Sequence, residues 1–395
     1  MAIIARLSQP WRGLSRNTWL IAASMLLWSM GLTLYDPLLS IHLIDLGADP
    51  TTVGSIFSAA YLIVALTSIP AGLLADRFNR KSLMILFWSI GTPSVLIISL
   101  AQTWQQSLVG IAMYFSSFMG FPAVNAYLTD GTEPQFLTRS FALMYTTFPA
   151  AQLLGPSLGG YIAERWSIQT VFWISFLFYA ASTLTVAQIK PQAPTAGEKT
   201  HFQLKQAWSF LREHPRFRRL AMIATLSYIV LTALTRFTSP FLWDVHGLGL
   251  FPIGVLNSMI AAGGMLFAAL LGHLAKRDNQ LSLLAFCLAI YAGALLVVAW
   301  TPNLLMLGLA FLLLGLIFPA RSMIDASIGS LSQGGQTGLI FGLFGLFIGL
   351  GQSIAPAIGG VLYSASTQAS FILVGLACFA LAAWIYSIRR TAHES

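Results

Sequence analysis

Residues 283–300 read LLAFCLAIYAGALLVVAW, a run that contains no charged residue. As a helix it would be apolar on every face, unlike the ten-residue alternating segments of a transmembrane β-barrel. At a rise of about 1.5 Å per residue, roughly 20 residues cross the ~30 Å hydrocarbon core of a bilayer. The run therefore predicts a membrane-spanning helix, whose backbone hydrogen bonds are all made within the helix.

The rest of the chain repeats this pattern. Of its 395 residues, 56% are hydrophobic and only 9% are charged. A soluble protein of this size would have too little polar surface with such a composition. We therefore predict an all-α integral membrane protein with twelve transmembrane helices. The predicted spans are residues 17–45, 50–75, 82–101, 105–129, 138–163, 168–190, 218–244, 251–275, 281–300, 304–328, 337–363 and 369–388.

The basic residues predict the topology. A net charge of +8 could indicate nucleic-acid binding. However, fourteen of the 21 Lys and Arg residues lie before the first span, after the last span, or in connections that follow even-numbered spans, and four more, Arg139, Lys190, Arg218 and Arg219, lie at the span ends that border those connections. The positive-inside rule makes that side cytoplasmic, so both termini are expected inside. We expect a multi-pass protein of a bacterial-type inner membrane, with membrane lipids rather than nucleic acid as its charged surroundings.

The two halves of the chain align with each other at a constant shift of 200 residues. The shift aligns Gly47 with Gly247, Val53-Gly54 with Ile253-Gly254, Gly72 with Gly272, Phe141 with Phe341, Pro156 with Pro356, and Gly159-Gly160 with Gly359-Gly360. The predicted parts are an N-terminal six-helix half (1–190), a cytoplasmic linker with an amphipathic helix (191–217) and a C-terminal six-helix half (218–395). Parallel repeats of this kind place a substrate site between the halves, near the bilayer midplane.

A charged motif, Gly72-Leu-Leu-Ala-Asp-Arg-Phe-Asn-Arg-Lys81, follows the second span. It resembles the GxLADRxGRK signature of the major facilitator superfamily, with Asn79 where the family usually has Gly. The resemblance implies two pseudo-symmetric six-helix halves and a cytoplasmic gate in which Asp76 caps a helix near Thr337-Gly338. The gate residues would be Gly72, Asp76, Arg77, Arg80 and Lys81, with Gly72 allowing close helix approach. A simpler interpretation is that these charges only set the topology.

A second motif lies in the fifth span. Gly155, Pro156, Gly159 and Gly160 resemble the GPxxGG motif of the family's twelve-helix drug:proton antiporters, although Ala142 and Ala151 replace the upstream glycines. We expect these four residues to act in packing or as a hinge. The arginine that proton-coupled members usually carry in the fourth span is replaced by Gly110, so any proton path must be built differently.

Charged residues are scarce inside the predicted spans, and each is a functional candidate because burial in lipid is costly. Asp36 and Arg236 lie about 13 and 12 Å from the outer ends of their helices, and the 200-residue shift aligns them. We hypothesise that they approach each other as a proton-coupling or gating pair. The alternative is a permanent structural pair, or an Arg236 that reaches local water.

Other polar residues complete the candidate set. Arg321 and Asp325, four residues apart on one helical face, are assigned to a cytoplasmic gate, with substrate contact an equal alternative. Asp130 and Arg139 are expected to be solvated. The substrate-cavity candidates are Tyr35, Asn125, Tyr145, Gln152, Tyr228, Asn257 and Gln352. Interhelical hydrogen bonding without substrate is the alternative role for the uncharged polar members.

These features together predict a secondary active transporter that works by alternating access. Proton-coupled efflux of amphipathic or drug-like small molecules is the leading interpretation. An alternative is transport of an anionic or lipid-like solute that uses Arg236 and Arg321. A membrane enzyme or a sensor is a further alternative, disfavoured because the chain has no HExxH, GxSxG or GxxxxGK[ST] motif. We expect a monomer that binds protons and a small-molecule substrate, with no metal and no cofactor.

Overall fold

The computed structural model describes residues 13–193, 210–276, 279–329 and 337–394, and within these ranges every regular element is helical. Most of the predicted linker, and the side chains around Thr337-Gly338, lie outside the described residues. The helices are α2 (Arg16–Asp45), α3 (Pro50–Ala75), α4 (Arg80–Gly91), α5 (Ser94–Leu100), α6 (Trp104–Ser116), η2 (Ser117–Gly120), α7 (Phe121–Gly131), α8 (Pro134–Arg165), α9 (Ile168–Val186), α11 (Pro215–Thr232), α12 (Thr238–Asp244), α13 (Leu250–Leu274), α14 (Gln280–Trp300), α15 (Leu304–Leu314), α16 (Ile317–Gly329), α17 (Thr337–Ala365) and α18 (Thr367–Glu394).

Ten helical segments among the described residues are long and apolar enough to cross a membrane. They coincide with ten of the twelve predicted spans. The fifth and seventh predicted spans are not among the ten. The fifth corresponds to α8, which is long but carries Thr, Gln, Pro and Gly residues that lower its hydropathy. The seventh corresponds to α11 and α12, and it is missing because α11 begins with three arginines and ends at a break.

Local signals in the sequence explain where the helices begin. Pro50, Pro134 and Pro215 each open a helix, a position where the missing N–H costs nothing. Asn303 caps α15 by accepting hydrogen bonds from the amides of Leu305 and Met306 at 3.0 and 3.2 Å, and Asn79 and Ser167 cap α4 and α9 in the same way. Asp49, just before α3, accepts bonds from Thr52, which hold the pKa of its carboxyl below the usual range.

Two glycines that the repeat aligns have the same backbone role. Gly47 follows α2 with φ +90°, and Gly247 follows α12 with φ +64°. These left-handed conformations are strained for residues with a Cβ atom. The amide of Ala48 closes the first turn on the Leu43 carbonyl at 3.0 Å, and that of Leu248 closes the second on Leu242 at 3.0 Å. The two turns therefore end the predicted first and seventh spans by related hydrogen bonds.

Four of the predicted spans are interrupted rather than continuous. The interruptions are Thr92-Pro93 in the third span, the 3₁₀ turn η2 in the fourth, Ala233–Phe237 in the seventh and Gly315-Leu316 in the tenth. Pro93 removes a backbone donor, whereas the others tighten into i→i+3 hydrogen bonds, such as Phe237 N to Leu234 O at 2.9 Å. Such turns inside spans occur at hinges and functional sites.

The chain divides into two compact units. The first comprises Met1–Leu38 with Leu66–Glu198, and the second comprises Leu39–Ala65 with Lys199–Ser395. The end of α2 and most of α3 therefore pack with the C-terminal part of the chain. The two six-helix halves expected from the repeat divide the chain by residue order rather than by contacts, and that division stays a prediction.

Aromatic residues fill the interior of the first unit. The Trp28 ring stacks on Tyr179 with centroids 4.3 Å apart and lies 5.0 Å from Trp88. The hydroxyl groups of Tyr35 and Tyr179 are hydrogen-bonded at 3.1 Å. The Trp88 indole N–H donates to the Ser182 hydroxyl at 3.0 Å. These contacts join α2, α4 and α9 through stacked and hydrogen-bonded aromatic rings.

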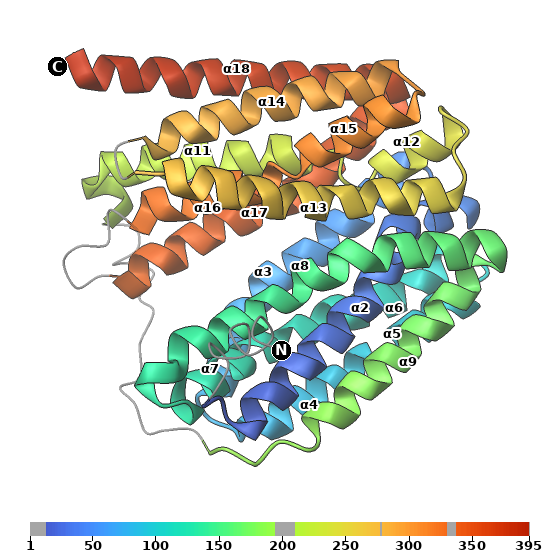
Figure 1. Ribbon diagram of the computed structural model, residues 1–395, viewed down its shortest axis with the longest axis vertical. Helices are drawn as coiled ribbons and strands as arrows, with labels where there is room; N and C mark the ends of the chain where they lie inside the picture. Colours follow the sequence, from blue (N-terminus) through green and yellow to red (C-terminus); the bar gives the residue numbers. More distant parts are fainter. Residues whose placement is uncertain (1–12, 194–209, 277–278, 330–336, 395) are drawn as a thin grey trace, which may run out of the picture. The chain divides into compact units, whose positions relative to one another are not determined.

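In the second unit, α14 and α18 run side by side along much of their length (Figure 1). Gly375 of α18 lies against Ala292 of α14, where an added Cβ would be 3.4 Å from the carbonyl oxygen, an ordinary contact distance. A cluster of rings closes the end near α12, with Phe241 4.5 Å from Phe371 and Phe237 5.1 Å from Tyr363. Small residues face each other where α14 and α18 meet, and aromatic rings fill the space near α12.

Candidate functional site

Arg236 lies in the turn between α11 and α12, where the regular hydrogen bonds of the span are interrupted. Its Nη2 donates to the hydroxyl of Tyr61 at 2.7 Å. Its guanidinium carbon lies 4.2 Å from the centre of the Phe57 ring and 5.9 Å from that of Tyr61. Both rings belong to one face of α3, within the second unit. The cation is thus held by a phenol and an aromatic face rather than by water alone.

The same face of α3 packs closely on α17. A Cβ at Gly360 would lie 2.6 Å from the Pro50 carbonyl oxygen and 3.2 Å from the Gly54 Cα. One turn along, the Ala357 amide donates to the Ser58 hydroxyl at 2.9 Å. We call this contact of α3 (Pro50–Ala65) with α17 (Gly349–Gly360) the α3–α17 seam. Through this seam and the contacts of Arg236, the N-terminal part of α3 is joined both to α17 and to the turn between α11 and α12.

A second cation in this unit lies on α16. The guanidinium carbon of Arg321 is 5.1 Å from the centre of the Tyr228 ring, which belongs to α11. Asp325, one helical turn beyond, interacts electrostatically with Arg321. The Arg321 Nε atom is buried and has no hydrogen-bond partner among the described residues. The arrangement leaves a donor available inside the membrane-spanning part of the chain.

Arg80 makes the densest polar network of the first unit. Its Nη2 forms an ion pair with Asp130 at 2.5 Å. Its Nη1 donates to the Ala126 carbonyl at 3.0 Å and to the Gln192 side chain at 3.1 Å, and its backbone amide bonds the Gln192 carbonyl. The side chain is 5% exposed. Arg80 therefore joins the start of α4 to α7 and to the segment after α9.

Asp130 was expected to be solvated, and it is an exposed residue that also forms the ion pair with Arg80. The pair was not foreseen, because α4 and α7 bring their ends together, which a linear sequence does not display. Arg139 is exposed, in line with the expectation, and lies 6.0 Å from the Phe136 ring.

The other signature residues are less constrained. Asp76 and Arg77 are exposed and Lys81 is half-buried. A Cβ at Gly72 would meet nothing within 4 Å among the described residues. The helix start near Thr337-Gly338 belongs to the other unit and its side chains lie outside the described residues, so the close approach at Gly72 stays a prediction. The predicted contact of Asp76 with the start of α17 involves side chains outside the described residues and stays a prediction.

Asp36 is half-buried on α2, immediately before Pro37. It belongs to the first unit and Arg236 to the second, so the hypothesised pair stays a prediction. The partners of Arg236 on α3 were not foreseen. The spacing of Phe57 and Tyr61 by one helical turn is the only signal in the sequence that could have suggested them.

The cavity candidates of the first unit fall into two groups. Tyr35 is 1% exposed and packs inside the aromatic core, so its predicted place on an open cavity is not observed. Asn125 on α7 and Gln152 on α8 each carry a buried side-chain oxygen without a hydrogen-bond partner. Tyr145 is 62% exposed and stacks on Phe141. Asn125 and Gln152 are therefore the members with unused hydrogen-bonding capacity.

In the second unit, Asn257 on α13 donates to the Ser239 hydroxyl at 3.2 Å and to the Ile253 carbonyl at 2.9 Å. These bonds match the alternative role of joining helices. Tyr228 is 5% exposed beneath Arg321. Gln352 is half-buried on α17.

The glycines of the fifth span have a packing role that the repeat reproduces. A Cβ at Gly155 would meet the Thr33 side chain, and one at Gly159 would meet the Leu34 backbone. The hydroxyl of Thr33 also donates to the Ala151 carbonyl at 3.2 Å. In the second unit, Gly359 meets the Ala233 backbone in the same manner. Pro156 and Gly160 are buried within α8.

The absence of the usual arginine in the fourth span has a steric cause. Gly110 of α6 lies against the backbone of Ser94, and a Cβ there would be 2.7 Å from the Ile98 side chain. A long side chain cannot be accommodated without separating α5 from α6.

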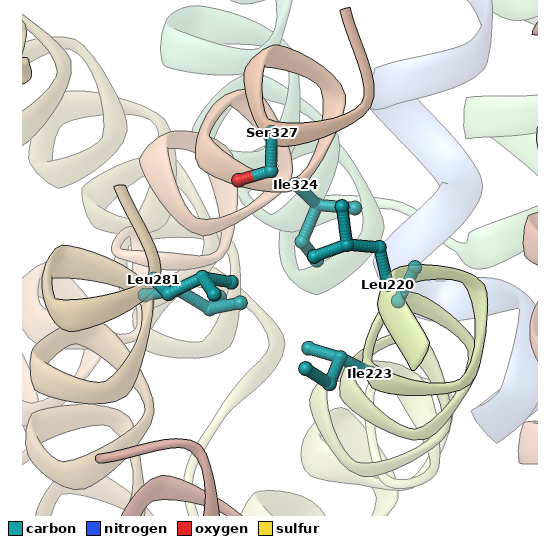
Figure 2. A pocket seen from close by; sticks show the side chains of 7 residues that line it. Leu220, Ile223, Leu281, Ile324 and Ser327 are labelled. Carbon is teal, nitrogen blue, oxygen red and sulfur yellow. The ribbon is translucent and has the colours of Figure 1, made fainter. Parts of the chain in front are cut away.

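A small pocket lies between α11, α14 and α16. Side chains including Leu220, Ile223, Leu281 and Ile324 line it and leave no room for a water molecule (Figure 2). The hydroxyl of Ser327 at its edge donates to the Met323 carbonyl at 2.7 Å. This is an apolar packing gap rather than a ligand site. Among the described residues, no cluster of three His, Cys, Asp or Glu side chains could hold a metal ion.

Curated relatives align with most of the chain. Multidrug resistance protein 2 of Bacillus subtilis (strain 168) is 26% identical over 369 residues, which cover 88% of each chain. The multidrug resistance protein MdtG of Serratia proteamaculans (strain 568) is 26% identical over 333 residues, 80% of this chain and 77% of that protein.

Solved structures show the same fold. A variant of the nucleoside transporter NupG superposes with a TM-score of 0.81 at 13% identity, covering 94% of this chain and 99% of that one. A bacterial homologue of the human lysosomal transporter Spinster gives a TM-score of 0.73 at 14% identity, covering 96% and 98%. These relatives and structural neighbours are transporters, not enzymes. The family model of the Major Facilitator Superfamily matches residues 21–322, well over half of the sequence, and the chain therefore belongs to this superfamily of membrane transporters.

Proposed function

We propose that this transporter exports amphipathic or drug-like small molecules by alternating access and uses the proton gradient across a bacterial inner membrane. The observation that carries the proposal is the alignment with a multidrug resistance protein over 88% of both chains. The protein works as a monomer, binds protons and substrate, and keeps both termini in the cytoplasm, in accord with its basic loops.

The geometry supports a broad apolar substrate rather than a densely charged one. The intramembrane candidates are few, and two of those with unused hydrogen-bonding capacity among the described residues, Asn125 and Gln152, are uncharged amides. The cation Arg321 has the carboxylate of Asp325 beside it, so the pair contributes little net charge. The exposed ring of Tyr145 offers a face for stacking without specifying one ligand.

Asp36 is the proposed proton-coupling residue. A carboxylate on a membrane-spanning helix can bind a proton in one conformation of the transporter and release it in another. The Asp36→Asn substitution preserves the size of the side chain but removes the group that binds the proton. Arg236, held by Tyr61 and Phe57, is the proposed gating partner because it lies where the seventh span is interrupted. In Asp36→Asn, gradient-driven transport should fall by at least about tenfold, equivalent to about 1.4 kcal/mol.

The test uses purified protein in liposomes, a cationic amphipathic dye such as ethidium, and an imposed pH gradient. The wild-type protein should move dye against its gradient, and Asp36→Asn should retain dye exchange at equal pH while losing the response to the gradient. Asp45→Asn, which alters a carboxylate at the end of the same helix, serves as the control. Equal pH dependence in Asp36→Asn and wild type would exclude Asp36 as the coupling site.

One observation favours the alternative substrate class. The buried, unpartnered Nε of Arg321 could bind a carboxylate or phosphate of an anionic solute. In that case Arg321→Gln would abolish transport of an anionic amphipathic dye and leave ethidium transport nearly unchanged. Transport of neither dye under any gradient would contradict both candidates and favour a non-transporting sensor.

A further inference from the structure

A groove of about 440 Å³ opens on the second unit beside the first turns of α11. It is lined on one side by the short helical turn before α11, along its length by α11, and on the far side by α17. Its lining residues are Leu211, Arg212, Arg218, Met222, Thr225, Leu226 and Phe347. Two arginines therefore stand at one end of an otherwise apolar groove.

The apolar end is built on a tightly packed floor. The hydroxyl of Thr225 donates to the Phe347 carbonyl at 3.2 Å, and a Cβ at Gly351 would lie 3.0 Å from the Thr225 carbonyl oxygen. Above this floor Met222 and Leu226, one helical turn apart, are 46% and 38% exposed. The groove thus presents hydrocarbon on a membrane-spanning helix, where an acyl chain is the natural neighbour.

The charged end is held in position by hydrogen bonds. The Nη1 atom of Arg218 donates to the carbonyls of Leu211 and Arg212, both at 3.3 Å. A guanidinium has five N–H donors in a planar fork, and no described residue engages the other three. Arg212 is also exposed and lines the same groove. Two such forks can bind phosphate oxygens at short range.

A second groove of the same unit shows that this combination is not general. It measures about 660 Å³ and is lined only by uncharged residues of α13 and α15, among them Phe251, Pro252, Met259, Leu304 and Leu305. That groove offers hydrocarbon contact and nothing for a headgroup. The first groove, which we call the α11–α17 groove, differs because it combines two arginines with a length of apolar side chains. These two parts match the headgroup and the acyl chain of a lipid.

We propose that the α11–α17 groove binds an anionic phospholipid. Its headgroup phosphodiester lies between Arg212 and Arg218, and one acyl chain lies over Met222, Leu226 and Phe347. The arginines fall where the first turn of the span meets the headgroup layer, on the side that the basic loops assign to the cytoplasm. Anionic lipids attract basic residues at that surface. The exposed Glu213 does not line the groove, so it does not oppose the phosphate there.

The experiment measures binding of fluorescent phosphatidylglycerol and phosphatidylcholine to the full-length protein in detergent. The double variant Arg212→Gln with Arg218→Gln should weaken phosphatidylglycerol binding by about tenfold or more. Arg216→Gln with Arg219→Gln is the matched control, because it removes the same charge from the same turn outside the groove. This control should change the affinity by less than about twofold.

Two further arms keep the proposal testable if the double variant folds poorly. Leu226→Trp, which fills the apolar end, should weaken phosphatidylglycerol binding, and free glycerol phosphate should not displace the lipid at the same concentration. Equal weakening in both arginine pairs would reduce the effect to general surface charge and overturn the proposal. Equal affinity for the two lipids, or displacement by glycerol phosphate alone, would overturn it as well.

Discussion

Arg80 and Arg236 are both cations withdrawn from water, and their surroundings make them suited to different tasks. Arg80 is 5% exposed and meets a carboxylate, a carbonyl and an amide side chain. Arg236 is half-buried and meets a phenol and an aromatic face. A buried cation with an ion pair and several hydrogen bonds is difficult to rearrange, whereas contacts with a phenol and aromatic rings can be exchanged. The first is a structural joint, and the second is suited to a gate.

Removing the Arg80 side chain should destabilise the protein strongly. Arg80→Ala removes the ion pair with Asp130 and the hydrogen bonds to Ala126 and Gln192, and a hydrogen bond to a charged group contributes about 1.5–3 kcal/mol. We expect a clearly lower melting temperature for the protein in detergent. Arg77→Ala is the control, because Arg77 is exposed in the same motif. Similar melting temperatures for the two variants would show that the network contributes little.

The contact of Arg236 with Tyr61 can be measured by a double-mutant cycle. Tyr61→Phe keeps the ring but removes the hydroxyl that accepts the hydrogen bond, at a cost of about 1.5–3 kcal/mol for a bond to a charged group. In an Arg236→Met background the same change should cost much less, since the donor is gone. Unfolding in mixed micelles gives the four free energies. Additive effects of the two substitutions would contradict a direct interaction.

At the scale of the helices, the interruptions and the small residues have separate roles. Gly360 of α17 lies against the start of α3, whereas Gly345, four turns earlier on the same helix, faces open space. The glycines at 159 and 359 support equivalent approaches in the two halves. Close approach therefore occurs at particular glycines and not wherever a glycine occurs.

The α3–α17 seam predicts opposite outcomes for two Gly→Ala substitutions on one helix. Gly360→Ala should cost about 1–3 kcal/mol, because neither backbone can move away from the added methyl group. Gly345→Ala should be neutral, or stabilising by about 0.4–1 kcal/mol, since it lowers the entropy of the unfolded chain. Thermal unfolding in detergent compares them. A stable Gly360→Ala variant would indicate that the helices are not in close contact there.

At the scale of the whole molecule, the distribution of basic residues predicts the orientation. A fluorescent protein fused to the C-terminus should fold and fluoresce, because that end is expected in the cytoplasm. Alkaline phosphatase fused after Gly247 should be active outside, and a fusion after Lys276 should be inactive. Activity after Lys276 but not after Gly247 would reverse the topology.

The sequence by itself determined the membrane-spanning helices, the 200-residue repeat and the superfamily. Each of these depends on a local or periodic property: hydropathy over about 20 residues, the spacing of glycines and prolines, or a contiguous motif such as residues 72–81. Caps such as Asn79 and Asn303, and the left-handed glycines at 47 and 247, belong to the same class because a few neighbouring residues decide them.

Only the tertiary structure decided which side chains meet. The partners of Arg80 lie 46, 50 and 112 residues away, and those of Arg236 lie 175 and 179 residues away. Residue type gives no information about pairing at that separation, because apolar helices can pack on one another along several faces. The same reason explains why Tyr35 is a core residue and Asp130 an ion-pair partner.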